Sequence, residues 1–264
     1  MDFVRINGVL LHYRVAGRAD APVLALVNSL GTDARLWDAV IAALADRYRL
    51  ISYDKRGHGL SDAPAGDYRL DQHVDDLEGL LAHLGVERLA LAGVSVGGLI
   101  AQGFALRHPT RLAALVLSNT AARLGDAAGW NARIAAVRQA GPAAIADAVM
   151  ERWFSPGFRE QRPDALAGWR TLFCRTDAEG YAATCATLRD TDLRPLVGTI
   201  TAPTLVVAGQ QDQSTPPALV ETLAAAIPGS RFAIVEGAGH LPAIEQPETL
   251  AGLLRDFLTE SGHG

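Results

Sequence analysis

The residues best suited to chemistry lie in one stretch, Gly-Val-Ser-Val-Gly at residues 93–97. An apolar run over residues 89–92 precedes this stretch, and a run of small and apolar residues follows it through residue 107. A strand, a turn and a helix in this order form a nucleophile elbow, in which a strained turn exposes the serine hydroxyl at the carboxyl edge of a sheet. The alternative is a glycine-rich loop that only connects a strand to a helix. The strand before and the helix after favour a nucleophilic Ser95.

A serine hydroxyl needs a base in contact with it and a third group that orients the base. Of the seven histidines, only His58 and His240 lie in loops at the carboxyl ends of strands, where such sheets place their sites. We expect His240, in a glycine-containing loop after the strand at 232–235, to be the base. His58 lies between two glycines and is expected to be a turn residue bonded to backbone. Asp212, which follows the strand at 204–208, is the expected acid.

The chain order of these groups, serine then aspartate then histidine, is that of α/β-hydrolases. The other position sometimes used for the acid holds Ser-Asn-Thr at residues 118–120 and no carboxylate, which favours Asp212. Glu236 is also near the histidine, but its position suits a structural hydrogen bond better. We therefore predict a catalytic triad of Ser95, Asp212 and His240, which requires no metal and no cofactor.

Two convergent backbone N–H groups are expected to stabilise the oxyanion that forms when the serine attacks a carbonyl. The N–H of Val96 supplies one, because this residue starts the helix after Ser95. The loop after the strand at 23–27 should supply the second, and Leu30 is our choice there. Backbone donors leave no side-chain signature, so the choice depends on the position of the loop.

Strands alternate with amphipathic helices over most of the chain, which predicts an α/β fold with a mostly parallel eight-stranded sheet flanked by helices. The expected strands cover residues 3–6, 10–15, 23–27, 50–53, 89–92, 112–117, 204–208 and 232–235. The alternation stops at residues 121–200, named here the cap segment, where helix-like runs and three of the four tryptophans lie. We expect a helical cap inserted between two strands of a core made of residues 1–120 and 201–264.

Composition limits the possible classes of function. The 264 residues are 49% hydrophobic and 20% charged, as in a soluble globular protein. A net charge of −5 gives no basic footprint, so nucleic acid is not an expected partner. Cys174 and Cys185 are too few for a disulfide framework and lack metal-type spacing with histidine. No signal-peptide pattern or membrane-length apolar run is visible, so a cytoplasmic protein without membrane contact is expected.

Four motifs resemble those of the 3-oxoadipate enol-lactonases, which are α/β-hydrolases of bacterial aromatic degradation. They are Asn-Ser-Leu-Gly-Thr-Asp at 28–33, Tyr-Asp-Lys-Arg-Gly-His-Gly-Leu-Ser at 53–61, the elbow at 93–97 and Glu-Gly-Ala-Gly-His at 236–240. The resemblance extends into the cap segment and covers nearly the whole chain. It implies hydrolysis of a small five-membered enol-lactone with an acetate arm to 3-oxoadipate, a step of the β-ketoadipate pathway.

The carboxylate of such a lactone requires a local cation in this acidic protein, and arginine suits it because it is planar and always charged. The candidates in the cap segment are Arg123, Arg133, Arg138 and Arg152. We favour Arg133, with Trp130 and Trp153 as apolar walls. The alternative for each arginine is a solvated position on a cap helix.

Other functions are compatible with the same residues. A broad-specificity carboxylesterase or a cofactor-free perhydrolase would use the same triad. Outside enzymes, the fold also serves as a small-molecule receptor, which would bind its ligand without hydrolysing it. Peptide-bond cleavage, as in proline iminopeptidases, would require an acidic subsite for a free amine. A strong preference for an anionic lactone over a neutral ester would distinguish the lactonase from the esterase.

Overall fold

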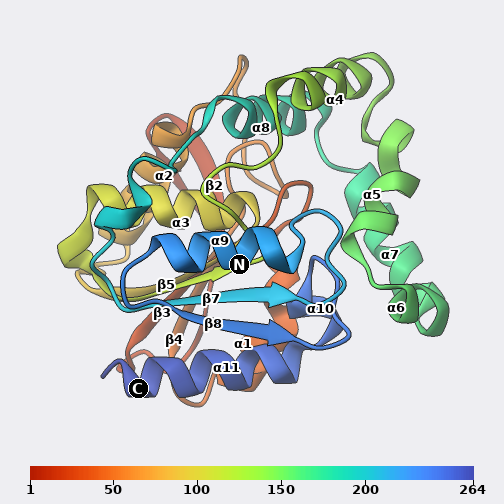
Figure 1. Ribbon diagram of the computed structural model, residues 1–264. Helices are drawn as coiled ribbons and strands as arrows, with labels where there is room; N and C mark the ends of the chain where they lie inside the picture. The colour runs from red at the N-terminus through yellow and green to blue at the C-terminus, as the bar shows by residue number, and fades with distance from the viewer.

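The computed structural model describes all 264 residues and is built around one eight-stranded sheet (Figure 1). The strand order is β1-β2-β4-β3-β5-β6-β7-β8. The β1–β2 and β2–β4 pairs are antiparallel, and all other neighbours are parallel. The predicted α/β fold with a mostly parallel sheet is thus confirmed. The strands are β1 Asp2–Ile6, β2 Val9–Gly17, β3 Val23–Val27, β4 Arg49–Tyr53, β5 Leu89–Val94, β6 Leu112–Ser118, β7 Thr204–Gly209 and β8 Arg231–Val235.

Burial explains why the central strands read as continuous apolar runs. Every residue of β5, β6 and β7 is buried, because helices cover both faces of a parallel sheet. The edge strand β1 instead has mostly exposed residues. The turn that joins β1 to β2 has positive φ at both Asn7 and Gly8, at 50° and 81°, as a tight hairpin turn requires.

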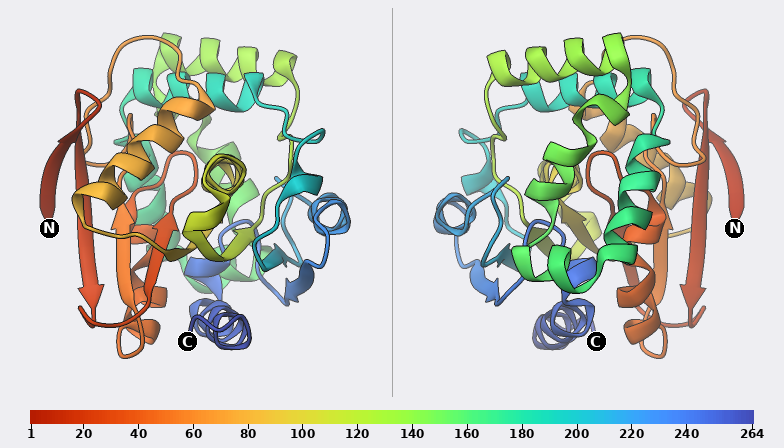
Figure 2. Two further views of the ribbon diagram at one scale, coloured as in Figure 1. Left: turned by 90° about the vertical axis from the view of Figure 1, so that its left-hand side faces the viewer. Right: turned by 90° about the vertical axis from the view of Figure 1, so that its right-hand side faces the viewer.

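Helices outside the cap segment pack on the two faces of this sheet. Figures 1 and 2 show α2, α3 and α9 on one face and α1 and α11 on the other. Their amphipathic patterns bury one side of each helix, as in α2, where Val74, Leu77 and Leu81 face the core. The helices are α1 Asp38–Leu44, α2 Leu70–His83, α3 Val96–Arg107, α9 Pro217–Ala226, α10 Pro242–Glu245 and α11 Pro247–Glu260, with the 3-10 helices η1 Ala34–Trp37 and η2 Pro109–Arg111.

Between β6 and β7 the chain forms helices and no strand. Figure 1 shows α5, α6 and α7 beyond the carboxyl ends of β7 and β8, while α4 and α8 lie side by side in both figures. The cap segment therefore lies at the sheet edge where the site is expected. Its helices are α4 Ala127–Ala140, η3 Pro142–Ile145, α5 Ala146–Trp153, α6 Pro156–Gln161, α7 Pro163–Cys174, α8 Ala178–Asp190 and η4 Val197–Thr199.

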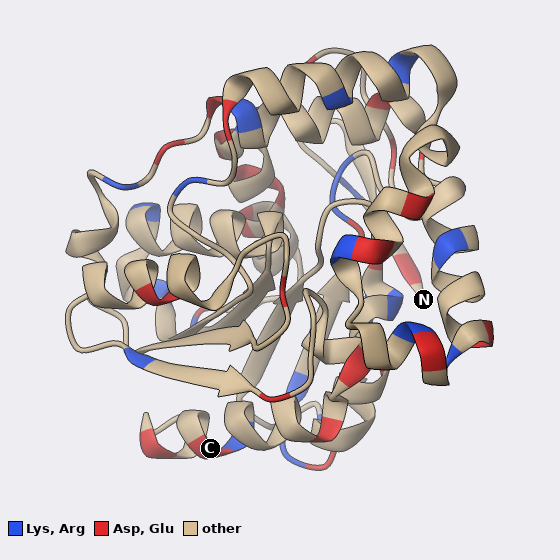
Figure 3. Ribbon diagram, turned by 45° about the vertical axis from the view of Figure 1, so that its right-hand side comes forward, with Lys and Arg blue, Asp and Glu red and all other residues tan.

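Charged residues lie mainly on helices and loops. In the view of Figure 3, Lys and Arg are interspersed with Asp and Glu, and the strands in the middle of the molecule are largely uncharged. No helix has both the length and the apolar character needed to cross a membrane. Both cysteines are free, and burial raises the pKa of the Cys185 thiol to about 12, which makes it a poor nucleophile.

Candidate active site

Ser95 occupies the turn between β5 and α3 and has φ 59° and ψ −119°, a strained conformation for a residue with a side chain. Glycine is required on both sides of it. A Cβ atom on Gly93 would lie 2.2 Å from the carbonyl oxygen of Gly97, and one on Gly97 would lie 2.3 Å from that of Val27. The N–H of Ser95 donates to the carbonyl of Ser118 at 3.1 Å. The local geometry is that of a nucleophile elbow.

The imidazole of His240 lies against the carboxylate of Asp212. Nδ1 of His240 is 2.8 Å from Oδ2 of Asp212, and both side chains are buried. Asp212 follows β7 and His240 follows β8, so two neighbouring parallel strands bring together residues that are 28 positions apart. The backbone N–H of His240 also donates to the carbonyl of Trp153 at 2.9 Å, which connects the histidine loop to the cap segment.

Four further donors hold the Asp212 carboxylate. Oδ1 accepts from the N–H groups of Ser214 at 2.7 Å and Thr215 at 3.0 Å. Oδ2 accepts from the Thr215 hydroxyl at 2.5 Å and from Nδ2 of Asn119 at 2.8 Å. Burial raises the pKa of this carboxyl, but His240, Thr215 and Asn119 outweigh the burial and hold it below its ordinary value. Asp212 therefore stays ionised and fixes the imidazole with Nδ1 protonated.

The sequence reasoning missed Asn119, Thr215 and Glu245. Oε1 of Glu245 accepts from the N–H of Gly239 at 2.7 Å, and Oε2 accepts from that of Ser155 at 2.9 Å. Burial raises the pKa of Glu245. A structural hydrogen bond was expected of Glu236, and this expectation is wrong: Glu236 is exposed and forms no side-chain hydrogen bond. Glu245 is the carboxylate that bonds to the histidine loop. Two sequence features could have indicated Glu245. It lies six residues after Gly239, and it belongs to a short helix, α10, that begins at Pro242.

Ser95 and His240 line one cavity of about 640 Å³, roofed by α4, α5 and α8 of the cap segment. Leu30, from the loop after β3, lines it as well. The Ser95 hydroxyl and the imidazole form no hydrogen bond with each other, and catalytic hydrogen bonds are often long before substrate binds. Val96 is the first residue of α3, so its N–H has no acceptor within the helix. Of the five residues predicted for the chemical step, Ser95, His240 and Leu30 line this cavity, Asp212 contacts His240, and Val96 follows Ser95 directly.

Two of the four candidate arginines are engaged away from the cavity. Arg123 pairs with Asp192 at 3.4 Å. Arg138 pairs with both Asp67 and Glu179 at 3.0 Å. Neither lines the cavity, so Arg138 is a solvated cap-helix residue, as in the alternative interpretation, and Arg123 is a partly exposed residue of the loop between β6 and α4.

The other two, Arg133 and Arg152, line the cavity and form no ion pair. The guanidinium of Arg133 lies over the ring of Trp130, 5.1 Å from its centroid. Trp130 and Trp153 line the same cavity, and Trp153 packs edge-on against Phe173 at 5.5 Å. The cavity that Ser95 lines therefore also holds two arginines outside any ion pair and two tryptophan side chains.

The sheet, the elbow and the inserted helices define an α/β-hydrolase. The chain belongs to the alpha/beta hydrolase family, whose model matches residues 24–253. Within that family it is similar to 3-oxoadipate enol-lactonase 2 of Acinetobacter baylyi, with 40% identity over 94% of this chain and 92% of that protein. The family and this relative identify an ester-hydrolysing enzyme, and they confirm the resemblance seen in the motifs.

Solved structures agree with this assignment. The enol-lactonase from Burkholderia xenovorans LB400 has a TM-score of 0.95 and 40% identity, over 98% of this chain and all of that chain. A thermophilic esterase from Thermogutta terrifontis has a TM-score of 0.95 and 31% identity, and each chain is covered completely. The fold is therefore shared by a lactonase and an esterase.

Proposed function

We propose that this enzyme hydrolyses 3-oxoadipate enol-lactone to 3-oxoadipate, with Ser95, His240 and Asp212 as its triad. The observation that carries the proposal is the shared cavity, which is lined by Ser95, by the Asp212-bound His240 and by two arginines that form no ion pair. The identity of 40% to two enol-lactonases, one curated and one of solved structure, supports the substrate.

The first half of the reaction forms an acyl-enzyme. Because Nδ1 of His240 is committed to Asp212, Nε2 is the nitrogen that takes the proton of Ser95. The alkoxide attacks the lactone carbonyl, and the N–H groups of Leu30 and Val96 stabilise the oxyanion. Collapse of this intermediate breaks the ring C–O bond. The leaving group is an enol, which departs more readily than an alkoxide and so makes a modest demand on His240 as an acid.

The second half regenerates the serine. The enol stays tethered to the acyl group and can close the ring again until it tautomerises to the ketone, which removes that nucleophile. His240 then activates a water molecule, which attacks the acyl carbonyl, and the proton returns to Ser95 as the new carboxylate leaves.

The cap segment, residues 121–200, supplies substrate recognition in this proposal. Arg133 pairs with the carboxylate of the acetate arm, while Trp130 and Trp153 hold the ring. The arrangement gives a small anionic lactone a local cation in a protein whose net charge is negative. The free cysteines fit the reducing cytoplasm, where we expect the enzyme to work.

The test is a comparison of two substrates on purified enzyme. We expect hydrolysis of 3-oxoadipate enol-lactone, followed by its ultraviolet absorbance, with a kcat/KM far above that for p-nitrophenyl acetate. Ser95→Ala should abolish turnover of both. Equal or higher kcat/KM on the neutral ester would reject the lactonase.

A broad carboxylesterase is the second candidate. The cavity of about 640 Å³ is larger than a five-membered lactone needs, and the similarity to the T. terrifontis esterase points the same way. The same substrate comparison decides between the two, since an esterase gains nothing from the negative charge of the lactone.

A further inference from the structure

The loop after β3, residues 28–32, accepts a hydrogen bond from a buried lysine side chain. Nζ of Lys55 donates to the carbonyl oxygen of Ser29 at 2.6 Å. Lys55 is the only lysine in the chain; all its other lysine-or-arginine positions hold arginine. Its side chain is only 1% exposed and forms no ion pair. Burial lowers the pKa of Lys55 to about 7, although Asp54 and Asp33 act to raise it.

The contact matters because of what else belongs to the same peptide group. The carbonyl of Ser29 and the N–H of Leu30 are joined in one planar trans unit, so they point in opposite directions. Fixing the Ser29 oxygen toward Lys55 therefore fixes the Leu30 N–H toward the other side of the loop. The Thr32 hydroxyl donates to the same oxygen at 3.0 Å and reinforces this orientation.

The next peptide group is fixed in the same way. The N–H of Gly31 donates to Nε2 of His58 at 2.9 Å, while Nδ1 of His58 lies 3.4 Å from the carbonyl oxygen of Arg56. Burial lowers the pKa of His58 well below its ordinary value, so the ring is neutral and Nε2 accepts. Lys55 and His58 thus hold the two peptide groups that flank Leu30. The turn-residue role expected of His58 agrees with these contacts.

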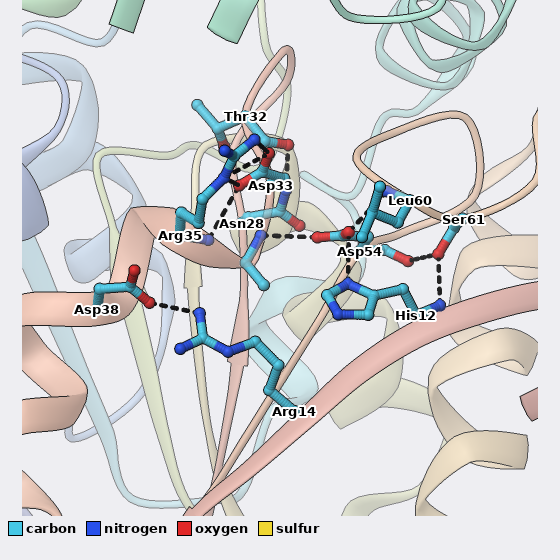
Figure 4. Close-up of polar contacts among 11 residues, drawn as sticks. His12, Arg14, Asn28, Thr32, Asp33, Arg35, Asp38, Asp54, Leu60 and Ser61 are labelled. Atoms are coloured by element: carbon cyan, nitrogen blue, oxygen red, sulfur yellow. Dashed lines mark hydrogen bonds and ion pairs between the residues drawn. The ribbon is translucent and has the colours of Figure 1, made fainter. Parts of the chain in front are cut away.

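The segment that carries both side chains is itself held by hydrogen bonds to Asp54. Figure 4 shows the carboxylate of Asp54 in contact with Nδ1 of His12 at 2.7 Å and with the N–H of Leu60 at 2.8 Å. The other oxygen of Asp54 accepts from the N–H of Ala34 at 2.7 Å, just beyond the loop after β3. Asp54, which precedes Lys55, therefore connects the segment 54–60 to Ala34, close to the loop that Lys55 contacts.

A buried cation without an ion pair opposes folding, because burial removes the water that solvates its charge. An apolar residue at this position would avoid that cost. At the Ser29 oxygen the ammonium charge of Lys55 has an effect that an apolar residue lacks. It polarises the Ser29–Leu30 peptide group and makes the Leu30 N–H a stronger donor. Buried, perturbed ionisable groups of this kind are typical of functional sites.

We propose that Lys55 is a positioning residue of the oxyanion hole, acting through the Ser29–Leu30 peptide group to aim and strengthen the Leu30 N–H. The inference depends on the proposed role of Leu30. Loss of the lysine leaves the Ser29 oxygen with only the hydroxyl and the N–H of Thr32 as donors. The Leu30 N–H is then held less firmly and polarised less, which weakens one of the two oxyanion donors while substrate binding is preserved.

The first test is Lys55→Met, which keeps the length and apolar stem of the side chain and removes the donor. We expect kcat on the lactone to fall on the order of a hundredfold, as when one oxyanion donor is removed, with KM changed by less than about threefold. Thr187→Val is the matched control, because it also removes a buried side-chain donor to a carbonyl, that of Tyr68 at 2.9 Å. Its kcat should stay within about twofold of wild type.

The second test uses the wild-type enzyme, so it stands even where Lys55→Met fails to fold. A single lysine gives one side-chain resonance in protein labelled with 15N-lysine. Adding phenylboronic acid, which forms a tetrahedral anionic adduct with a reactive serine, should shift this resonance, and Ser95→Ala should abolish the shift. An unmoved resonance in the wild-type adduct would overturn the inference.

Different results would reject the proposed triad and the proposed role of Lys55. Full lactone hydrolysis by Ser95→Ala would reject the triad and the inference together. An inactive Ser95→Ala combined with a folded Lys55→Met of undiminished kcat would reject only the role of Lys55. A rise in KM with unchanged kcat in Lys55→Met would do the same, because it indicates lost substrate binding.

Discussion

Asn119 donates from Nδ2 to Oδ2 of Asp212 at 2.8 Å, and this oxygen is also the one that contacts His240. The residue that follows β6 thus supports the acid that follows β7. Asn119 has φ 49°, a conformation that asparagine tolerates better than most residues. Ser118 in turn donates to Oδ1 of Asn119 at 2.7 Å, which fixes the amide with its NH₂ group toward Asp212.

Removing this amide should slow the chemical step. Asn119→Gly keeps the positive φ and deletes only the side chain, so we expect kcat to fall about tenfold or more, since a hydrogen bond to a charged group is worth about 1.5–3 kcal/mol. KM should change little, because Asn119 is not among the residues that line the cavity. Steady-state kinetics on the lactone measure both values. An unchanged kcat would mean that the remaining donors orient Asp212 unaided.

Arg133 should distinguish anionic from neutral substrates. Arg133→Ala removes the cation over Trp130, and we expect KM for the lactone to rise about 10- to 100-fold from the loss of a charged hydrogen bond. KM for p-nitrophenyl acetate should stay near the wild-type value. Arg138→Ala is the control, because Arg138 is paired with Asp67 and Glu179 and does not line the cavity. An equal rise in KM for both substrates would show that Arg133 does not bind the substrate carboxylate. Arg152, the other unpaired arginine of the cavity, would then be the candidate.

The strands, and the loops after them that carry the three triad candidates, could be predicted from the sequence because each depends on a local pattern. The apolar run before Ser95 predicted a strand at 89–92, and β5 extends only two residues further. In the cap segment, apolar residues recur with helical spacing over residues 134–140, which form the second half of α4, whereas the helix itself begins at Ala127. Its first turns were missed because Gly129, Trp130 and Asn131 give no apolar periodicity there.

Contacts between segments that lie far apart in the chain could not be predicted from the sequence. Asn119 and Asp212 are 93 residues apart, and Lys55 contacts a backbone carbonyl 26 residues away. A hydrogen bond to backbone leaves no complementary side chain in the sequence, so nothing in the pattern around Lys55 marked it. The arginines were equally ambiguous, because pairing with Asp67 or Asp192 depends on how the cap helices pack.

The buried lysine should also give the wild-type protein a stability that rises with pH. The unfolded chain holds the Lys55 proton up to its ordinary pKa near 10.5, whereas burial lowers the folded-state pKa to about 7. Between these values the unfolded state binds more protons, so this group makes the free energy of unfolding rise by at most about 1.4 kcal/mol per pH unit. Urea denaturation at pH 7 to 10 should show this rise relative to Lys55→Met. Parallel profiles of the two proteins would contradict the lowered pKa.

Glu245 should be important to both stability and catalysis, because it joins the histidine loop to the cap segment through Gly239 and Ser155. Glu245→Ala leaves two N–H groups without their acceptor, and we expect a loss of about 2–6 kcal/mol in the free energy of unfolding, since each unsatisfied buried donor costs about 1–3 kcal/mol. Glu245→Gln retains one acceptor oxygen and should lie between the alanine variant and wild type. Because His240 follows Gly239 directly, kcat should fall in the same order as stability, measured well below the Tm of each variant. A destabilised Glu245→Ala with wild-type kcat would show that His240 is positioned by Asp212 and the Trp153 carbonyl alone.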